Sequence, residues 1–414
     1  MRALLAAVGS HGDILPMIAI GRELLAQGHE VIFFANPVFS AYALEAGMSF
    51  VPISNADAYS ALLGDLVEDK PDQAFERVAN ESAALNRVFY PAMRAQVLPG
   101  QTIAVGGSLL FAPRLLKETE GVPCVTIHLA PSVIRSNEQP ARLMPKWIVA
   151  STPSWIKSLA WWIADRRYDA WLTKPLNQQR KELGLLPVRR IFQSWIHGAD
   201  CVIGMFPDWF AQPQSDWPAH LHLSGFPLYD HGQVDDISPG LAAFLNAGAA
   251  PVGISAGTAT ARSGEFFRTS IAACQAAGLR GVLLSPYSEH IPSALPEGFF
   301  HATYAPYRQL LPRLSVFIHH GGIGSTSQAL LAGVPQLIRP VAYDQFDNSA
   351  RTVNLGVGKE ILVKDYTAAH VANTLRMLVG DGEMRDRCRQ VSRHFNGSHS
   401  AADAAKAIET TFLD

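Results

Sequence analysis

Residues Phe317–Asn348 read FIHHGGIGSTSQALLAGVPQLIRPVAYDQFDN. The apolar run Val316–Ile318 predicts a short strand, which turns at Gly321–Gly322 into a helix with Ser325 in its first turn. Glycines let the backbone approach a ligand closely, and the start of a helix presents unpaired N–H groups and a partial positive charge. The stretch therefore predicts an anion site suited to a phosphate or a diphosphate.

The same stretch continues into a second strand and two polar side chains. Gly333 and Pro335 end the predicted helix, and residues 335–338 are expected to form the next strand. Asp344 and Gln345 follow at its carboxyl end, which is the edge where open α/β sheets bind ligands. This pair is predicted to contact a polyol beside the phosphate.

The N-terminal half opens with a comparable pattern. The apolar run Ala3–Val8 predicts a strand buried on both faces, and the loop GSHGD at 9–13 leads to a helix expected from about Ile14, with Pro16 in its first turn. Residues 31–34 give the next strand, so the chain begins as a doubly wound α/β sheet. The loop lacks G-x-G-x-x-G, and a dinucleotide fingerprint is therefore not supported.

Strand and helix patterns alternate along the rest of the chain, whose 414 residues suggest two α/β domains. Further strands are predicted at 50–53, 102–105, 124–127, 201–204, 251–255, 282–284 and 299–304. Helices are predicted at 72–93, 108–120, 264–277, 345–355, 368–378, 384–395 and 401–412. The predicted organisation is an N-terminal domain 1–228, a polar linker 229–240, a second domain 241–390 and C-terminal helices 391–414 that cross back to the first domain.

The composition excludes several classes of protein. A net charge of −2 without a Lys/Arg run gives no electrostatic case for nucleic acid. Four cysteines without a C-x-x-C pair indicate buried, reduced thiols. The first apolar run is too short for a signal peptide, and no uncharged stretch is long enough to span a membrane, so we expect a cytoplasmic protein.

An aromatic-rich segment at 147–172 includes Trp161 and Trp162. The simplest interpretation is a core or interdomain helix, because cores also use tryptophan. The functional alternatives are a lid over a hydrophobic acceptor, contacted by these two residues, or a surface that touches the inner membrane peripherally.

His319 and His320 are neighbours on the predicted strand, so their side chains point to opposite faces and do not easily bind one metal. His320 adjoins the glycine turn and can donate to a diphosphate, whereas His319 is expected to be packed. Thr258, in the loop 256–260, can bring a hydroxyl to the same phosphate, or merely cap its helix.

Two motifs in opposite halves carry a resemblance. HHGGIGSTSQALLAGVP followed by P-x-x-x-D-Q resembles the nucleotide-sugar signature of the GT-B family 1 glycosyltransferases, and GSHGDILP resembles the acceptor loop of their bacterial and sterol-type members. FPDWFAQPQSDWP, SGFPLYD, RRIFQSWIHG and AYDQFDN are similar to the rhamnosyltransferase B subunits of rhamnolipid synthesis, which join an activated L-rhamnose to a hydroxyacyl lipid.

The resemblance implies an α/β GT-B fold, with two Rossmann-like parallel-sheet domains facing across a cleft, and assigns the donor site. Tyr304 would stack on the base, where plant members have Trp, and the Ala305 backbone would pair with its edge. Gln328 stands where plant members carry a ribose-binding Glu, and Asp344 and Gln345 would read the sugar hydroxyls. The diphosphate would be held by His320, Gly322, Gly324, Ser325 and Thr258.

For catalysis, the resemblance implies that Asp13 removes the proton of the acceptor hydroxyl in a single inverting displacement, with His11 as an assistant. From the residues alone, Asp13 fits equally a helix cap, and His11 a solvent-facing loop residue. No D-x-D motif occurs, so neither a metal nor any cofactor besides the nucleotide-sugar co-substrate is expected.

The expected reaction moves a sugar from dTDP-L-rhamnose or UDP-glucose to a hydrophobic acceptor, first a 3-hydroxyacyl lipid. The alternative is a UDP-glucose-dependent glucosyltransferase of an aromatic or polyketide natural product. Two rival functions share the phosphate cradle, namely a nucleotide-sugar epimerase and a non-catalytic binding subunit.

Overall fold

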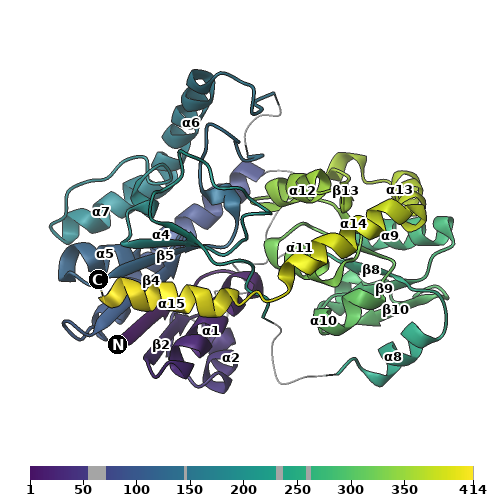
Figure 1. Ribbon diagram of the computed structural model, residues 1–414, viewed down its shortest axis with the longest axis horizontal. Coiled ribbons are helices and arrows are strands. Elements are labelled where there is room, and N and C mark those ends of the chain that lie inside the picture. The colour runs from purple at the N-terminus through teal and green to yellow at the C-terminus, as the bar shows by residue number, and fades with distance from the viewer. Residues whose placement is uncertain (55–70, 144–146, 230–235, 258–262, 414) are drawn as a thin grey trace. The chain divides into compact units, whose positions relative to one another are not determined.

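The computed structural model describes residues 1–54, 71–143, 147–229, 236–257 and 263–413 (Figure 1). The chain divides into two compact units. Unit 1 holds Met1–Leu62, Asp72–Tyr229 and His399–Asp414, and unit 2 holds Asp230–Ser398 with a short segment before Asp72.

Unit 1 is built on a seven-stranded parallel sheet with the order β3-β2-β1-β4-β5-β6-β7. Its strands are β1 (Arg2–Ala6), β2 (Glu30–Ala35), β3 (Ser49–Pro52), β4 (Thr102–Gly107), β5 (Cys124–His128), β6 (Cys201–Gly204) and β7 (Leu221–Leu223). The chain runs outward from β1 to β3 and then returns to place β4 on the other side of β1. The topological switch point, where open α/β sheets bind ligands, therefore lies between β1 and β4.

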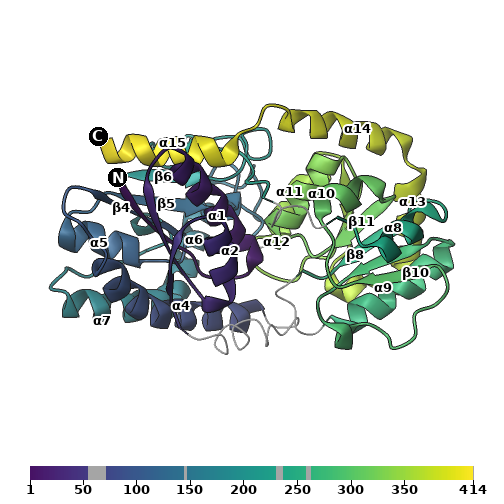
Figure 2. The ribbon, with the colours of Figure 1, turned by 90° about the horizontal axis from the view of Figure 1, so that it is seen from below.

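Both faces of this sheet are buried, which explains its continuous apolar strands. Ala3 and Leu5 of β1 face one apolar core and Leu4 and Ala6 face the other, because successive side chains of a strand point to opposite sides. The helices that cover the two faces are visible in Figure 2. Those of unit 1 are α1 (His11–Ala26), α2 (Ser40–Glu45), α4 (Pro71–Arg94), α5 (Ala112–Glu120), α6 (Ser154–Tyr168), α7 (Lys174–Glu182) and α15 (Ser400–Leu413).

The C-terminal helix α15 packs on unit 1, with Ala404, Ala405 and Ile408 in the same core as β1 (Figure 1). The Ser400 hydroxyl donates to the Phe226 carbonyl at 2.6 Å. The last helix thus belongs to the unit that contains the first strand.

Unit 2 has a six-stranded parallel sheet with the order β10-β9-β8-β11-β12-β13. Its strands are β8 (Val252–Ser255), β9 (Gly281–Leu284), β10 (Phe299–Ala302), β11 (Val316–His319), β12 (Gln336–Ile338) and β13 (Gly358–Glu360). Its helices are α8 (Pro239–Asn246), α9 (Gly264–Ala277), α10 (Tyr307–Leu310), α11 (Ile323–Ala332), α12 (Gln345–Asn354), α13 (Ala368–Gly380) and α14 (Gly382–Ser392). The switch point of this sheet lies between β8 and β11.

Several local predictions are wrong. Helix α1 begins at His11 and not near Ile14, so Pro16 is its sixth residue and lies beyond the first turn. The earlier start follows from a capping box at Ser10. Helix α5 begins at Ala112 rather than Ser108.

The edge strands β7 and β13 were not predicted, because each has only three residues and a polar side chain, His222 or Lys359, at its centre, so that neither forms an apolar run. The predicted linker 229–240 overlaps α8, which starts at Pro239, and its residues 230–235 lie outside the described part of the chain. Within the described residues, no helix combines the length and the apolarity that crossing a membrane requires.

Candidate functional site

The switch point of unit 2 brings together the loops that follow β8 and β11, and the loop after β12 lies beside them. Gly257 belongs to the first loop, Gly321 and Gly322 to the second, and Asp344 and Gln345 to the third. The two halves of the predicted nucleotide-sugar motif thus leave neighbouring strands at one sheet edge. Thr258, the remaining predicted diphosphate contact, lies outside the described residues.

The His320 imidazole lies between two glycines. A Cβ on Gly257 would come within 2.5 Å of its Cε1 atom, and a Cβ on Gly322 within 2.5 Å of its Nε2 atom. Any side chain at either position would displace the ring, so both glycines are required for this arrangement. Gly257 also has φ +83°, a region that favours glycine.

Burial lowers the pKa of His320 to about 4, so the ring is neutral near pH 7. Its Nδ1 atom is buried and has no hydrogen-bond partner among the described residues. A neutral imidazole donates through one N–H only, so its predicted donation to a diphosphate depends on the tautomer. A bound anion beside the ring would favour the protonated form and raise this pKa.

The N-terminus of α11 is open. Gly322 is its N-cap residue, and its first turn contains Gly324 and Ser325 but no acidic side chain. A Cβ placed on Gly324 would meet nothing within 4 Å. The first-turn N–H groups and the helix dipole are therefore available to a ligand anion.

His319 has a structural role, as expected. It is fully buried and stacks on Phe317 with ring centroids 4.9 Å apart. Its Nε2 atom lies 2.9 Å from the Gln336 side-chain oxygen, and its Nδ1 atom accepts from the Gly321 N–H at 3.1 Å. The ring therefore fixes the start of the glycine turn.

Asp344 and Gln345 are held by contacts within their own loop. The Gln345 side-chain oxygen accepts from the backbone N–H groups of Val341 at 2.8 Å and Ala342 at 3.1 Å. Its NH₂ group is then the part that can meet a sugar hydroxyl. Tyr343, just before this pair, has φ +56°, an uncommon value for a residue with a bulky side chain.

Asn348 is a residue that the sequence analysis missed. Its side-chain amide donates to the Gly321 carbonyl at 3.0 Å and to the Asp344 carboxylate at 2.7 Å, and the residue is fully buried. It thereby ties the glycine turn to the loop of Asp344. The sequence indicated this residue only by its place at the end of the stretch 317–348. Its hydrogen bond to Gly321 joins residues 27 positions apart and is formed only in the folded chain.

The other predicted donor residues are distributed around this edge. Tyr304 is 52% exposed in the loop after β10, and Ala305 beside it is buried. Gln328 is nine-tenths buried on α11. Contacts of these residues with a base and a ribose stay predictions.

In unit 1, Asp13 lies at the switch point, in the first turn of α1. One oxygen of its carboxylate, Oδ2, accepts from the Ser10 backbone N–H at 2.8 Å and from the Ser10 hydroxyl at 3.1 Å. A Cβ on Gly9 would come within 2.3 Å of that oxygen, so glycine is required there. The N-cap residue of α1 is therefore Ser10, and the alternative prediction that Asp13 is the N-cap is wrong: Asp13 is the third helical residue and bonds back to the cap.

Burial raises the pKa of Asp13, and the two bonds from Ser10 oppose this shift. The second carboxylate oxygen, Oδ1, is the one that a substrate hydroxyl could meet. A carboxyl with a raised pKa is also a stronger base than an exposed one. The bond back to the cap and the action as a base are compatible roles of one side chain.

His11 is the first residue of α1. Its Nε2 atom lies 3.1 Å from the Tyr42 hydroxyl, and its ring makes edge contacts with Phe39 and Tyr42. The described hydrogen bond of the ring is thus made to Tyr42, and assistance to Asp13 stays a prediction.

Trp161 and Trp162 do not share a surface. Trp161 is buried, and the Arg135 guanidinium lies 4.7 Å from its ring centroid. Trp162 is 46% exposed, with Arg166 lying 4.5 Å from its ring centroid. Contact of either residue with an acceptor stays a prediction.

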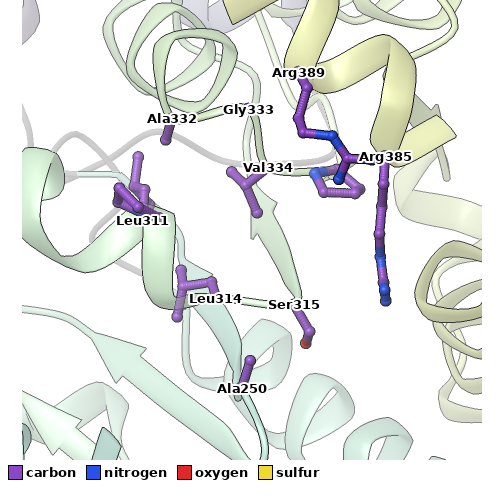
Figure 3. A pocket seen from close by; sticks show the side chains of 11 residues that line it. Ala250, Leu311, Leu314, Ser315, Ala332, Gly333, Val334, Arg385 and Arg389 are labelled. Carbon is purple, nitrogen blue, oxygen red and sulfur yellow. The ribbon is translucent and has the colours of Figure 1, made fainter. Parts of the chain in front are cut away.

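A cavity of about 250 Å³ in unit 2 does not coincide with the predicted donor site (Figure 3). Its lining includes Ser315 and Pro335, which directly precede β11 and β12, and Ala250, which lies two residues before β8. It therefore lies at the amino edge of the sheet, opposite the edge that carries His320.

Comparison with known proteins agrees with this arrangement. Residues 3–136 match the glycosyltransferase family 28 N-terminal domain, and residues 283–410 match the C-terminal domain of erythromycin biosynthesis protein CIII-like proteins. Glycosyltransferase GtfE of Amycolatopsis orientalis is 30% identical over 86% of this chain and 85% of its own length. O-mycaminosyltylonolide 6-deoxyallosyltransferase of Streptomyces fradiae is 27% identical over 99% of this chain and 97% of its own length.

Among solved structures, the glycotransferase of kitacinnamycin has a TM-score of 0.74 at 19% identity, with 99% of both chains covered. At that identity, the likeness is one of fold. The seven- and six-stranded sheets described above are the two Rossmann-like halves of this fold.

Proposed function

Because the chain belongs to the nucleotide-sugar-dependent GT-B glycosyltransferases of family 1, we propose that it catalyses an inverting transfer of a hexose from a nucleoside diphosphate to a hydroxyl group of a hydrophobic acceptor. In this proposal unit 2 binds the donor, and unit 1 binds the acceptor and supplies the base. Rhamnosyl transfer, as in rhamnolipid synthesis, is one specific form of it.

The observation that carries the proposal is the open N-terminus of α11 beside a neutral His320. The departing nucleoside diphosphate gains negative charge as the sugar–oxygen bond breaks. Backbone N–H groups and an imidazole fixed at that point stabilise the charge as it develops, where electrostatic help is most effective.

The acceptor hydroxyl attacks the anomeric carbon as the bond from that carbon to the diphosphate oxygen breaks. Its proton passes to Asp13 Oδ1, while Ser10 keeps Oδ2 in place. The products are the glycoside with inverted configuration, the nucleoside diphosphate and a protonated Asp13. The raised pKa of Asp13 favours this proton transfer.

The donor residues have distinct proposed roles. His320, Gly322, Gly324 and Ser325, together with Thr258, hold the diphosphate, and Asp344 and the Gln345 amide contact the sugar. Tyr304 and Ala305 hold the base, and Gln328 is proposed for the ribose. No divalent metal takes part in this proposal, so a chelator should leave turnover unchanged, and restoration of lost turnover by Mg²⁺ would contradict it.

Two acceptor classes are proposed, a 3-hydroxyacyl lipid and a hydroxylated aromatic or polyketide compound. The test crosses dTDP-L-rhamnose and UDP-glucose with a 3-hydroxyacyl lipid and a flavonoid, using the purified chain. Glycoside formation by the chain alone supports transfer and argues against a non-catalytic subunit. Conversion of the donor without an acceptor would instead indicate an epimerase.

Helix α6 supports a proposal on where the acceptor is met. Its exposed face carries Trp155, Leu159, Trp162 and Ile163, which are between 46% and 69% exposed. Its buried face carries the charged residues Lys157 and Asp165 beside Trp161. Four large apolar side chains of this helix are therefore exposed while two charged ones are buried, contrary to the usual pattern of a surface helix.

Polar contacts hold the helix in this rotation. Lys157 donates to the carbonyls of Asn137 at 2.5 Å and Ala150 at 2.6 Å, and Asp165 pairs with Arg135 and Arg190. Turning the apolar face inward would break these buried ion pairs and hydrogen bonds, which is strongly destabilising.

We infer that this face contacts an anionic lipid surface. Exposed Arg166 and Arg167 continue it at its C-terminal end, and no exposed residue of the helix is acidic. Tryptophan with arginine is typical of helices that lie in a membrane interface.

Cosedimentation with phosphatidylglycerol vesicles tests this inference. Trp155→Asp with Leu159→Asp should abolish binding, whereas Leu186→Asp, at an 82% exposed position elsewhere, should not change it. Equal binding of the double variant would contradict the inference, as would concentration-dependent dimerisation that the double substitution removes.

A further inference from the structure

Ser108, His128 and His197 form a hydrogen-bonded chain in unit 1 to which the sequence analysis gave no role. The Ser108 hydroxyl lies 2.8 Å from His128 Nδ1, and His128 Nε2 lies 3.0 Å from His197 Nδ1. His128 is completely buried, whereas Ser108 is partly accessible. The chain therefore leads from the core to the molecular surface.

Ser108 lies at the switch point. It follows β4, whose Gly106 pairs with Ala6 of β1, and the loop that leads to Asp13 in the first turn of α1 follows β1. Neighbouring strands lie about 4.8 Å apart. Ser108 and the Asp13 loop thus leave adjacent strands on the two sides of the crevice where such sheets bind ligands.

His197, at the far end of this hydrogen-bonded chain, determines which atom donates and which accepts in each of its hydrogen bonds. The His197 ring is also hydrogen-bonded to the Phe192 backbone, and this bond favours the charged imidazole, so the backbone atom is the carbonyl oxygen. Burial lowers the pKa of His197 to about 4, so the ring is neutral and has one N–H. Because Nδ1 faces His128, we infer that this N–H is on Nε2 and donates to the Phe192 carbonyl. Its Nδ1 atom must then accept from His128.

The roles of His128 and Ser108 follow in the same way. His128 donates through Nε2, so its Nδ1 atom accepts, and the Ser108 proton points to it. The other neighbour of this hydroxyl, the Ile127 carbonyl, lies 3.5 Å away, at the limit of a hydrogen bond. Toward a ligand, Ser108 therefore presents lone pairs and no proton.

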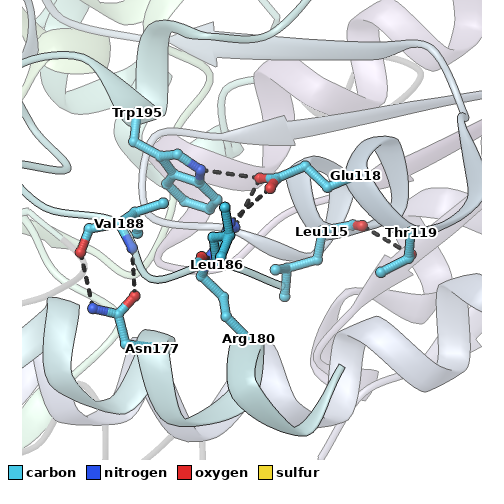
Figure 4. A network of polar contacts seen from close by, with 8 residues as sticks. All are labelled: Leu115, Glu118, Thr119, Asn177, Arg180, Leu186, Val188 and Trp195. Atoms are coloured by element: carbon cyan, nitrogen blue, oxygen red, sulfur yellow. Dashed lines mark hydrogen bonds and ion pairs between the residues drawn. The ribbon is translucent and has the colours of Figure 1, made fainter. Parts of the chain in front are cut away.

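The segment around His197 is well anchored (Figure 4). The Trp195 indole donates to Glu118 at 3.1 Å, and Arg180 binds the same carboxylate through two nitrogens at 2.8 and 2.7 Å. His220 donates to the His197 carbonyl at 2.6 Å. These contacts fix the backbone of the segment that carries His197.

Resting on the proposed function, we propose that Ser108 contacts the acceptor substrate as a hydrogen-bond acceptor only. It selects substrates that carry a second O–H or N–H donor next to the hydroxyl that reacts. A substrate with an ether or carbonyl oxygen there would face the Ser108 lone pairs with no proton between them, and a site built for a donor rejects such an analogue. Of the two acceptor classes, this favours the polyhydroxylated one.

The kinetic test uses a flavonoid with two neighbouring hydroxyls and its derivative with the non-reacting hydroxyl methylated. For the wild-type chain, kcat/KM should be roughly ten- to hundredfold lower with the methylated compound. Ser108→Ala should bring the ratio close to one. An unchanged ratio in Ser108→Ala would overturn the proposal.

Two variants at His128 test whether this residue acts by accepting the Ser108 proton or only by packing in the core. His128→Asn keeps an oxygen that can accept from Ser108 and should retain the selectivity. His128→Leu frees the Ser108 proton and should allow the methylated compound, whereas a structural role alone would lower both rates equally. If His128→Leu does not fold, the comparison of Ser108→Ala with the wild type still decides.

Nitrogen-15 spectra of the histidines in the full chain test the direction without turnover. We expect the Nε2–H tautomer at His128 and His197, and a change at His128 Nδ1 in Ser108→Ala. An Nδ1–H tautomer at His128 would overturn the proposal. Turnover with the lipid but with neither flavonoid would overturn the proposed selectivity of Ser108 and leave the proposed glycosyl transfer intact. No turnover with any acceptor would refute the proposed selectivity and the proposed function together.

Discussion

The two switch points of this chain are built alike but are used differently. Each places a βα loop at the carboxyl edge of a parallel sheet, in front of the N-terminus of a helix. In α1 that N-terminus is already occupied, because Asp13 lies in its first turn and binds Ser10. In α11 the first turn has no acidic residue, and Gly324 leaves its surface open.

This difference shows how the N-terminus of a helix after a βα loop can hold either a carboxylate of the protein or an anion of a ligand. A helix N-terminus stabilises one anion near its first turn. Where the chain supplies a carboxylate of its own, that carboxylate is fixed in place and can act as a base. Where the chain supplies none, the place is left for the phosphate of a ligand.

The largest expected effect comes from removing the carboxylate of unit 1. Asp13→Asn keeps an oxygen for the Ser10 bonds but cannot take a proton, so kcat should fall by roughly 10²- to 10⁴-fold. Donor affinity, measured by calorimetry with the nucleoside diphosphate, should not change. Near-normal turnover with intact donor binding would show that Asp13 serves only the capping box.

The second test closes the open N-terminus of unit 2. In Gly322→Ala, the new Cβ would lie 2.5 Å from His320 Nε2 and displace the ring. We expect the Kd for UDP or dTDP to rise roughly tenfold or more, at about 1.4 kcal/mol for each factor of ten. Gly382→Ala, at the start of α14, is the matched control, because a Cβ there meets nothing within 4 Å. An unchanged Kd in Gly322→Ala would exclude His320 from donor binding.

A third test loosens the connection between two loops of unit 2. Asn348→Ala removes the bonds to Gly321 and Asp344, so the sugar-contacting loop should lose its fixed position. We expect KM for the nucleotide sugar to rise by roughly five- to tenfold, since buried hydrogen bonds contribute about 1 kcal/mol each. The Kd for the free nucleoside diphosphate should change less. Equal losses for both ligands would mean that Asn348 supports only the glycine turn.

The smallest effect concerns stability and is shared by the two units. Burial lowers the pKa of His319 to about 3, of His320 and His197 to about 4, and of His128 well below its usual value. Between about pH 4 and 6.5 the unfolded chain therefore binds more protons, and the free energy of unfolding should rise with pH and level off above 6.5. The raised pKa of Asp13 acts in the opposite sense, but it is one group against four.

Urea unfolding at several pH values measures this slope. His319→Gln should lower it by about one proton. A wild-type slope of zero between pH 5 and 6.5 would contradict the neutral buried state of these histidines.

The sequence by itself determined the doubly wound architecture and the edge on which the site lies. The apolar runs at β1 and β11 predict strands buried on both faces, and the turn at Gly321 predicts the start of a helix, since these signals are local. The positions of Asp13, His320 and Gln345 at strand ends follow from the same local pattern.

Only the tertiary structure decided what surrounds these residues. The contact between Gly257 and His320, the bond from Asn348 to Gly321, and the chain from Ser108 to His197 join segments that are far apart in the sequence. The burial pattern of α6 likewise depends on partners outside the helix, such as Arg135. Periodicity reports which residues are apolar, whereas burial, proton direction and pKa depend on neighbours that only folding brings together.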